Sequence, residues 1–458
     1  MKKMFYKLAD AYLSDAIKVG DNFDAVRKVI SYKNKKGILY LLTTLTSASE
    51  CAVIAESLLL SKSFKKKEEQ LYNAAISTEN DYLNLKRLVL SGVAVLLLEE
   101  NDYALTIEVR KYPTRGISEP KSEKSVRGSK DGFTESINDN IGLLRRRVRD
   151  DKLSIYLTNV GNKSKTDIAI CSLDDKVDTK ILDCIKEKLK NLELESLVMT
   201  SKAIVEKLLP QHLKPFPLVR YSERPDIAAI NLYQGKIIIF VDTSPDVIIL
   251  PISYFDHLDN VEEYQQSPLV GSLTRLIRNF GVILSVFLVP IWYILVSETS
   301  INNYFILRPS KEVAMPLFLQ ILIAELFVEL IRLAIVHAPS ELTSSIGVVA
   351  AIILGSVTIE LDFFLPEVLV YISFAAIASF ATPSYELSLA NRLIKYSLLL
   401  LCFVFGRLGF IFGCLFLFLN MVSTKVYGKY YLAPLVPFDL KKMVNVFYRS
   451  DSNDNKIV

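Results

Sequence analysis

One long segment of the chain is almost free of charged side chains. Between Asn279 and Thr424, 15 of 146 residues are acidic or basic, about 10%, whereas the remaining 312 residues carry 89 charges, about 29%. Soluble domains have a charge density close to the second value, and a surface as apolar as the first is not stable in water. The sequence therefore predicts a soluble part joined to a membrane part, and it argues against a fully soluble enzyme.

The distribution of charge and of turn residues predicts a multi-domain chain. We expect two cytosolic α/β subdomains followed by a C-terminal α-helical transmembrane bundle of about five to six helices. The predicted parts are subdomain 1 (residues 1–112), a linker (113–132), subdomain 2 (133–274), the transmembrane domain (275–425) and a basic cytosolic tail (426–458).

Two segments of the soluble part have a similar order of patterns. Residues 30–64 contain a polar turn, YKNKKG, an apolar run, ILYLLTTLT, and a helical stretch. Residues 161–192 contain GNKSKT, DIAICSL and an amphipathic run, KILDCIKEKLKNL. We interpret both as a strand followed by a helix in subdomains of related layout, with chance similarity as the alternative. Residues 224–251 (RPDIAAINLYQGKIIIFVDTSPDVIILP) are predicted to form two or three short strands of the second sheet.

Overall charge and cysteine content exclude several classes of partner. The formal net charge is +4, so bases and acids are nearly matched and nucleic acid is not an expected partner. The five cysteines form no CxxC pair and no zinc spacing with the three histidines, so we expect reduced cysteines and neither metal nor cofactor. The N-terminus lacks the apolar core of a signal peptide, which predicts that roughly the first 270 residues stay in the cytosol.

Uncharged runs of 18 or 19 residues predict three membrane spans. About 20 apolar residues in a helix cross the hydrocarbon core of a bilayer. The three runs are residues 279–297, 342–359 and 368–385.

A further apolar run predicts a helical hairpin. Residues 396–424 are interrupted only by Arg407, and two glycines beside it favour a tight turn between two membrane helices. The first of these helices is expected to begin near Glu386, with two basic residues snorkelling at its end. The glycines are Gly406 and Gly409, and the basic residues are Arg392 and Lys395.

Residues 316–337 (PLFLQILIAELFVELIRLAIVH) are apolar except for charges on one helical face. Glu325, Glu329 and Arg332 recur at i, i+4 and i+7. Charges at membrane depth are costly, so this face must turn toward partner helices, water or the interface plane. Three interpretations stay open: a structural intramembrane salt bridge, the lining of a wet pore or pathway, and a helix that lies flat at the interface.

Positive charge predicts the direction of insertion. Arg275 and Arg278 precede the first span, whereas the loop 360–367 carries three acids and no base and is expected outside. The tail after Thr424 carries six basic residues, which favours a cytosolic C-terminus and an even number of crossings. We expect six crossings if both the charged helix and the hairpin cross.

An arginine cluster ends a predicted helix that starts near Phe133. Arg145, Arg146 and Arg147 lie at the negative pole of that helix, where positive charge is favourable. The cluster is either a solvated helix end or an inter-subunit or lipid-headgroup contact. We take these three arginines as the candidate subunit contact.

No common catalytic motif is present. The patterns GxxxxGK[ST], GxGxxG, HExxH and GxSxG are absent from the sequence. His257, in a polar segment, is more often incidental than catalytic, and His337 is more often a helix-end cap than a proton switch. We therefore predict no catalytic residue and no enzyme.

Several blocks of the sequence resemble a known family. VRGSKDGFTESINDNIGLLRRRVRD, VRYSERPDIAAINL, IIIFVDTSPDVIILP and FATPSYELSLANR are similar to signature blocks of the bacterial spore-germinant receptor A-subunit family. The resemblance runs from about Asn22 to about Pro437, and within the family it is closest to the stage V sporulation protein AF branch.

The resemblance implies a multi-pass protein of the spore inner membrane that assists germination. Its N-terminal domain would face the cytosol or spore core, and its partners would be other germination membrane proteins and membrane lipid. It further implies a homo-oligomeric ring whose membrane part forms a channel for monovalent cations. The family's charged positions fall on Glu325, Glu329 and Arg332.

These observations favour an oligomeric ion channel gated by its cytosolic subdomains. Glu325 and Glu329 would face the pore, and Arg332 would pair with one of them. The alternative is a scaffold or signalling subunit that conducts nothing itself. A secondary transporter is disfavoured, because the two halves of the membrane part show no repeat.

Overall fold

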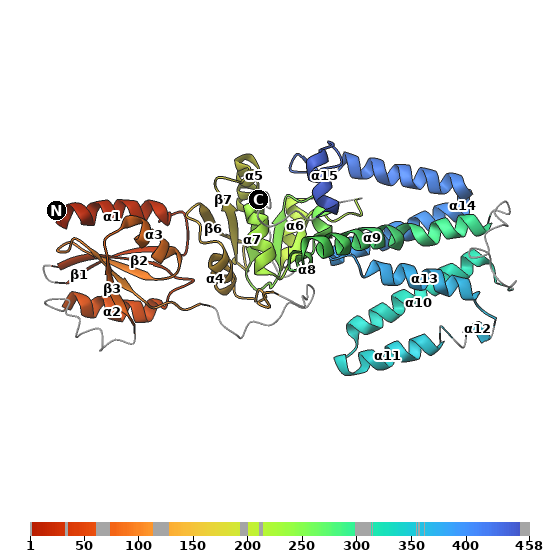
Figure 1. Cartoon of the computed structure of the whole chain (residues 1–458), viewed down its shortest axis with the longest axis horizontal. Helices are drawn as coiled ribbons and strands as arrows, with labels where there is room; N and C mark the ends of the chain where they lie inside the picture. Colours follow the sequence, from red (N-terminus) through yellow and green to blue (C-terminus); the bar gives the residue numbers. More distant parts are fainter. Residues whose placement is uncertain are drawn as a thin grey trace. The chain divides into compact units, whose positions relative to one another are not determined.

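The chain folds as two compact units (Figure 1). The first contains Met1–Pro210 and Val219–Ile252, and the second contains Gln211–Leu218 and Ser253–Asp451. Part of the predicted linker (113–127) and the end of the predicted tail (449–458) lie outside the described residues. The computed structural model describes residues 2–32, 35–60, 74–112, 128–192, 200–209, 214–297, 313, 315–353, 355, 358–360 and 362–448.

Two five-stranded antiparallel sheets in the first unit share one topology. Their strand orders are β1-β2-β4-β5-β3 and β6-β7-β9-β10-β8, so each strand of one sheet has a counterpart in the other. The weak sequence repeat therefore reflects a structural repeat, and chance similarity is the wrong interpretation. The strands of the first sheet are Ala25–Tyr32 (β1), Lys35–Leu42 (β2), Ile76–Glu79 (β3), Ala94–Leu98 (β4) and Ala104–Ile107 (β5). Those of the second are Leu153–Val160 (β6), Thr166–Leu173 (β7), Arg220–Ser222 (β8), Ile237–Val241 (β9) and Val247–Leu250 (β10).

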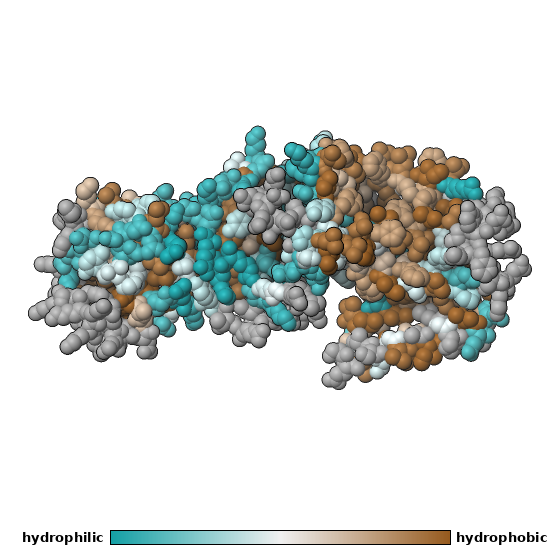
Figure 2. All heavy atoms as spheres, in the orientation of Figure 1, coloured by the Kyte–Doolittle hydropathy of each residue, from teal (hydrophilic) through white to brown (hydrophobic). Residues whose placement is uncertain are grey.

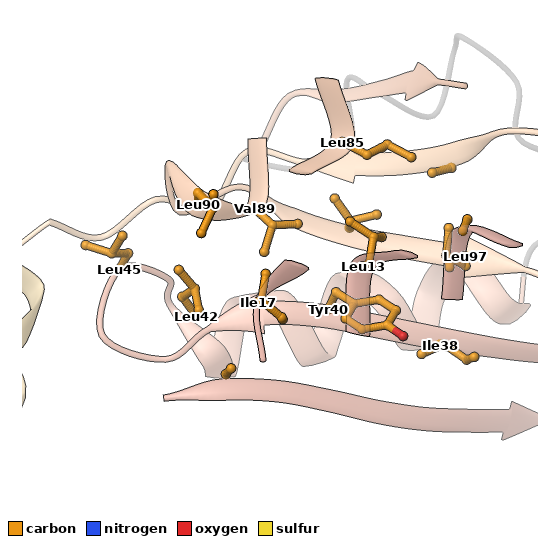
Figure 3. Packing of buried hydrophobic residues seen from close by; sticks show 14 residues of the cluster. Leu13, Ile17, Ile38, Tyr40, Leu42, Leu45, Leu85, Val89, Leu90 and Leu97 are labelled. Carbon is orange, nitrogen blue, oxygen red and sulfur yellow. The ribbon is translucent and has the colours of Figure 1, made fainter. Parts of the chain in front are cut away.

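Helices cover both faces of the first sheet, which explains why β2 is continuously apolar from Ile38 to Leu42 instead of alternating. Successive strand side chains point to opposite faces. Ile38, Tyr40 and Leu42 pack against α1 and α3 (Figure 3), whereas Leu39 and Leu41 pack against α2. The helices of the first unit are Lys2–Ala16 (α1), Ala48–Leu60 (α2), Tyr82–Leu90 (α3), Ile137–Arg147 (α4), Thr179–Lys190 (α5), Thr200–Leu208 (α6) and Pro225–Tyr233 (α7).

One predicted strand of the second sheet is a helix. Residues 224–251 supply β9 and β10 as expected, but their first part forms α7. Pro225 starts this helix and Asp226 lies in its first turn, both of which favour a helix N-terminus. Burial of Ile227 and Leu232 shows that packing outweighs the strand preference of β-branched residues here.

The second unit is helical. In the view of Figure 2, apolar residues cover most of its surface. Two helices among the described residues, α9 and α14, are long and apolar enough to cross a membrane. Its elements are Phe255–Leu258 (η2), Val261–Tyr264 (α8), Pro268–Ser297 (α9), Leu317–His337 (α10), Ser340–Ile352 (α11), Thr358–Glu360 (α12), Pro366–Ser379 (α13), Tyr385–Ser423 (α14), Lys425–Val426 (β11), Lys429–Tyr430 (β12) and Leu440–Phe447 (α15).

One predicted span forms a shorter helix than its uncharged run suggested. The run 342–359 contains most of α11, but three of its residues (354, 356 and 357) lie outside the described residues. In the run 368–385, α13 ends at Ser379. The 14 residues of α13 extend about 21 Å, less than the thickness of a hydrocarbon core.

The predicted hairpin is present inside α14. Gly406 has φ 58° and ψ −137°, a conformation that L side chains rarely adopt, and it divides α14 into two arms that fold back on one another (Figure 1). A Cβ at Gly409 would overlap the carbonyl oxygen of Leu401 on the other arm, and one at Gly413 would contact Leu398. Glycine at these positions therefore permits close packing of the arms.

We expect Gly409→Ala to destabilise the helical unit by roughly 1–3 kcal/mol, because the added methyl group forces the arms apart at a backbone contact. Thermal unfolding of the purified protein in detergent measures the effect. Gly347→Ala on α11 is the matched control, since no atom lies within 4 Å of its added Cβ. Equal melting temperatures for the two variants would contradict the packing described here.

Candidate functional site

A buried ion pair of the helical unit joins α10 to α14. The Nζ atom of Lys395 lies 2.7 Å from Oε1 and 2.6 Å from Oε2 of Glu325. Glu325 is 3% exposed and Lys395 is 5% exposed. A single charge in such surroundings costs several kcal/mol, so each group compensates the buried charge of the other.

Glu329, one turn further along α10, is shared by three side chains. Arg332 Nη2 lies 2.6 Å and Arg392 Nη1 lies 3.5 Å from its Oε2 atom. The Tyr396 hydroxyl donates to Oε1 at 3.2 Å, and Arg392 also donates to Ser388 Oγ at 3.1 Å. Glu329 is less deeply buried than Glu325, because its side chain is 20% exposed.

Helical periodicity explains how these groups meet. The α10 residues follow the spacing i, i+4 and i+7, and the α14 residues follow i, i+3 and i+4, so each set occupies one helical face. We call the combined set the α10–α14 charge cluster. Its members are Glu325, Glu329, Arg332, Arg392, Lys395 and Tyr396.

The charge cluster contains three cations and two carboxylates. Its formal charge is therefore +1, and both carboxylates are paired. Ion pairs join α10 to α14 through Glu325 and Lys395 and through Glu329 and Arg392. Arg332 pairs with Glu329, as expected.

The sequence interpretation of two α14 residues was wrong. Lys395 and Arg392 were expected to snorkel at a helix end, but Lys395 is buried against Glu325 and Arg392 contacts Glu329. The available signal was the spacing of 392, 395 and 396 on one face, which mirrors the stripe on α10.

The arginine cluster of α4 has three different environments. Arg145 is 2% exposed and donates from Nε and Nη2 to both carboxylate oxygens of Asp24, at 2.6 and 2.7 Å. Arg147 pairs with Asp131 at 2.6 Å, and Arg146 lies over the ring of Tyr112. Arg145 therefore binds within its own chain, while the Arg146 side chain is exposed.

His257 lies in the core and not in a polar loop. It is fully buried, its Nε2 lies 3.2 Å from the carbonyl oxygen of Pro217, and its Nδ1 lies 3.0 Å from Ser384 Oγ. Ser384 caps the N-terminus of α14. His257 thus connects η2 to the start of the hairpin. Its polar sequence neighbours gave no indication of this structural role. His337 is the last residue of α10.

The metal-ligating residue types do not cluster in the described parts of the chain, and Cys51 and Cys171 are deeply buried there. No group of three or more His, Cys, Asp or Glu residues within those parts is placed to hold a metal ion. Burial raises the pKa of Cys51 to about 11 and raises the pKa of Cys171 further, so both thiols are protonated at neutral pH.

Comparison with known proteins identifies the family. The model of the Bacillus/Clostridium GerA spore germination protein family matches residues 12–456. The chain belongs to the GerA family. The resemblance to germinant receptor A subunits inferred from the signature blocks is thereby confirmed.

Individual GerA relatives match over most of the chain. Stage V sporulation protein AF of Bacillus subtilis (strain 168) is 36% identical and covers 98% of this chain and 93% of its own length. An uncharacterized membrane protein of the same organism, YfkQ, is 28% identical over 84% of this chain and 76% of its own length. These relatives and the apolar helices indicate that this GerA-family protein associates with a membrane.

A solved structure also matches the GerA-family chain. The crystal structure of the N-terminal domain of the A subunit of the Bacillus megaterium spore germinant receptor GerK3 covers 54% of this chain and 92% of that chain. The sequence identity is 21% and the TM-score is 0.39.

Proposed function

We propose that this protein is an integral protein of the spore inner membrane that promotes germination. It assembles as a homo-oligomeric ring and conducts monovalent cations out of the spore core, together with other germination membrane proteins. GerA-family membership and the similarity to stage V sporulation protein AF support the role in germination. The observation that carries the channel proposal is the α10–α14 charge cluster, which places five charged side chains among apolar helices.

The graded exposure of the cluster supports this proposal. Glu325 is buried, whereas Glu329 and Arg332 are 20% and 21% exposed at the surface of a single chain. In a ring, these outer groups would repeat around the axis, and a ring of carboxylates is a physical route to cation selectivity. Because both carboxylates are paired here, we assign this arrangement to a closed channel. Opening would separate Glu329 from Arg332.

The same pairing favours a second candidate function. A cluster with no unpaired carboxylate and a formal charge of +1 suits a subunit whose helices only hold together and transmit a signal. Such a scaffold or signalling subunit would conduct nothing itself.

A flux measurement separates the two functions. We expect purified protein in potassium-loaded liposomes to release K⁺, and the Glu325→Gln/Glu329→Gln variant to lose most of that flux, because the carboxylates stabilise the cation in the open pore. Glu360→Gln changes an exposed carboxylate of the same unit and is the matched control. Equal elution volumes on a sizing column establish that all variants are folded.

Two other results of the flux measurement would contradict the channel proposal. Unchanged flux in the double variant would contradict the pore role of Glu325 and Glu329. No flux from the parent protein would favour the scaffold or signalling subunit.

We also propose that Arg146 and Arg147 contribute to the contact between subunits. Arg145 is left out because its side chain is buried in an ion pair with Asp24 of the same chain.

A further inference from the structure

The C-terminal helix α15 has an apolar face that the described part of the chain leaves exposed. None of its residues is buried. Its large apolar side chains recur at i, i+3, i+4 and i+7, which places them on one side. They are Leu440, Met443, Val444 and Phe447, and the flanking Phe438 and Tyr448 are 66% and 54% exposed.

Two side chains of α9 fix the position of α15. Arg275 Nη1 donates to the carbonyl oxygen of Asn445 at 2.5 Å, and Asn279 Nδ2 donates to that of Val446 at 3.3 Å. These carbonyls belong to the last turn of α15, where intrahelical partners are missing. Arg275 is itself held by Glu263, which is 1% exposed, at 2.8 Å.

These contacts place α15 at one end of the apolar segment of α9. Asn279 is the first residue of the uncharged run 279–297, and Arg278 is the last charged residue before it. If α9 enters a membrane, the bilayer surface lies at this level. A helix held there is at the depth of the lipid headgroups.

The charge around α15 is strongly positive. Between 425 and 448 there are four lysines and a single acid, Asp439. Asp439 caps α15 by accepting from the backbone N–H groups of Lys441 and Lys442, and it also pairs with the Lys442 ammonium at 3.7 Å. All four lysine side chains are exposed, and they are Lys425, Lys429, Lys441 and Lys442.

We propose that α15 lies in the surface of an anionic lipid bilayer, with its apolar face among the upper acyl chains and its lysines at the lipid phosphates. Exposed aromatic and aliphatic side chains opposite a lysine-bearing face are typical of helices that bind in this plane. An eight-residue helix offers far less than the roughly 800 Å² that each partner buries in a stable protein interface, which disfavours a second copy as the occupant. The inference rests on the proposed function only in requiring that α9 enters the membrane.

Tryptophan scanning of the full chain tests this inference. The single native tryptophan, Trp292, is 1% exposed, so its emission serves as a background to subtract. The test variant is Phe447→Trp on the apolar face of α15, and Asn445→Trp on the opposite face is its matched control. Phe416→Trp on the second arm of α14, where Phe416 is 68% exposed, reports insertion of the helical unit.

The variants are reconstituted in vesicles of phosphatidylcholine and phosphatidylglycerol whose acyl chains are brominated near the headgroup or near the bilayer centre. We expect Phe447→Trp to lose most of its emission to the shallow bromines and Asn445→Trp to retain most of its emission. Adding Lys441→Gln and Lys442→Gln should lower the equilibrium constant for binding of α15 to the lipid surface about fivefold per lysine. Each charge near an anionic surface contributes on the order of 1 kcal/mol.

Distinct outcomes would overturn the inference. If bromine quenches Phe416→Trp but not Phe447→Trp, α15 is not in lipid although the helical unit is inserted. If bromine quenches neither variant, the membrane insertion in the proposed function fails as well. Blue-shifted Phe447→Trp emission that bromine does not quench would show that protein covers α15. Equal quenching in pure phosphatidylcholine, with or without the lysines, would overturn the preference for anionic lipid.

Discussion

Replacing Asp24 with Asn is expected to destabilise the first unit by about 3–5 kcal/mol, the usual effect of removing one partner of a buried ion pair. Asp24 is fully buried and accepts two hydrogen bonds from Arg145 and one from Thr44 Oγ1 at 2.8 Å. The guanidinium cannot lose its proton in a protein, so Asp24→Asn leaves a buried charge that has no way to become neutral.

Because of its location, loss of the Asp24–Arg145 pair should loosen the contact between the two halves of the first unit. Asp24 directly precedes β1 and Arg145 lies on α4, so the pair joins elements that belong to the two different sheet-containing halves of the first unit. Asn22 adds a second link, because its Oδ1 accepts from the backbone N–H of Ile155 at 2.6 Å. Hydrogen exchange of the full chain should therefore accelerate around β1, α4 and β6.

An exposed ion pair between the same two halves provides the matched control. Asp174, 49% exposed, pairs with Lys18, and Asp174→Asn should change stability by less than about 1 kcal/mol, because solvent screens the pair. The Asp24→Asn/Arg145→Met double variant should recover much of the loss, since no buried charge remains. Similar exchange rates for Asp24→Asn and Asp174→Asn would contradict the burial of the Asp24 pair.

Lys395→Met is expected to destabilise the helical unit by a comparable amount, about 3–5 kcal/mol. The substitution keeps an unbranched apolar stem of similar length but removes the ammonium group that contacts both oxygens of Glu325. Among the described residues, the Tyr396 hydroxyl lies 3.5 Å from Oε2 of this carboxylate, a distance too long to replace the ion pair. Thermal unfolding in lipid nanodiscs measures the loss.

Two further variants separate charge from packing at this position. Glu325→Gln/Lys395→Met should melt closer to the parent than Lys395→Met does, because both buried charges are gone. Lys202→Met changes a lysine that is 63% exposed and 4.0 Å from Glu206, and it should have little effect. If Lys395→Met alone melts like the parent, α10 and α14 do not form this ion pair.

Local sequence patterns predicted several elements correctly because their physical causes are local. Gly406 permits the turn inside α14 whatever surrounds it, and the uncharged run from 279 matches the apolar part of α9. The spacing of Glu325, Glu329 and Arg332 placed them on one face through helix geometry alone. Local strand preference failed at α7, where burial against the second sheet favours a helix.

The sequence by itself determined which side chains share a helical face and which segments avoid water, whereas the matching strand orders of the two sheets decided that the first unit contains a repeat. Only the tertiary structure decided which charges meet. Lys395 is 70 positions from Glu325 and Arg145 is 121 positions from Asp24, and no periodicity extends over such separations. The pairings follow from helix and sheet packing. This packing removes the groups from water, and the nearest opposite charge then compensates most of the lost hydration.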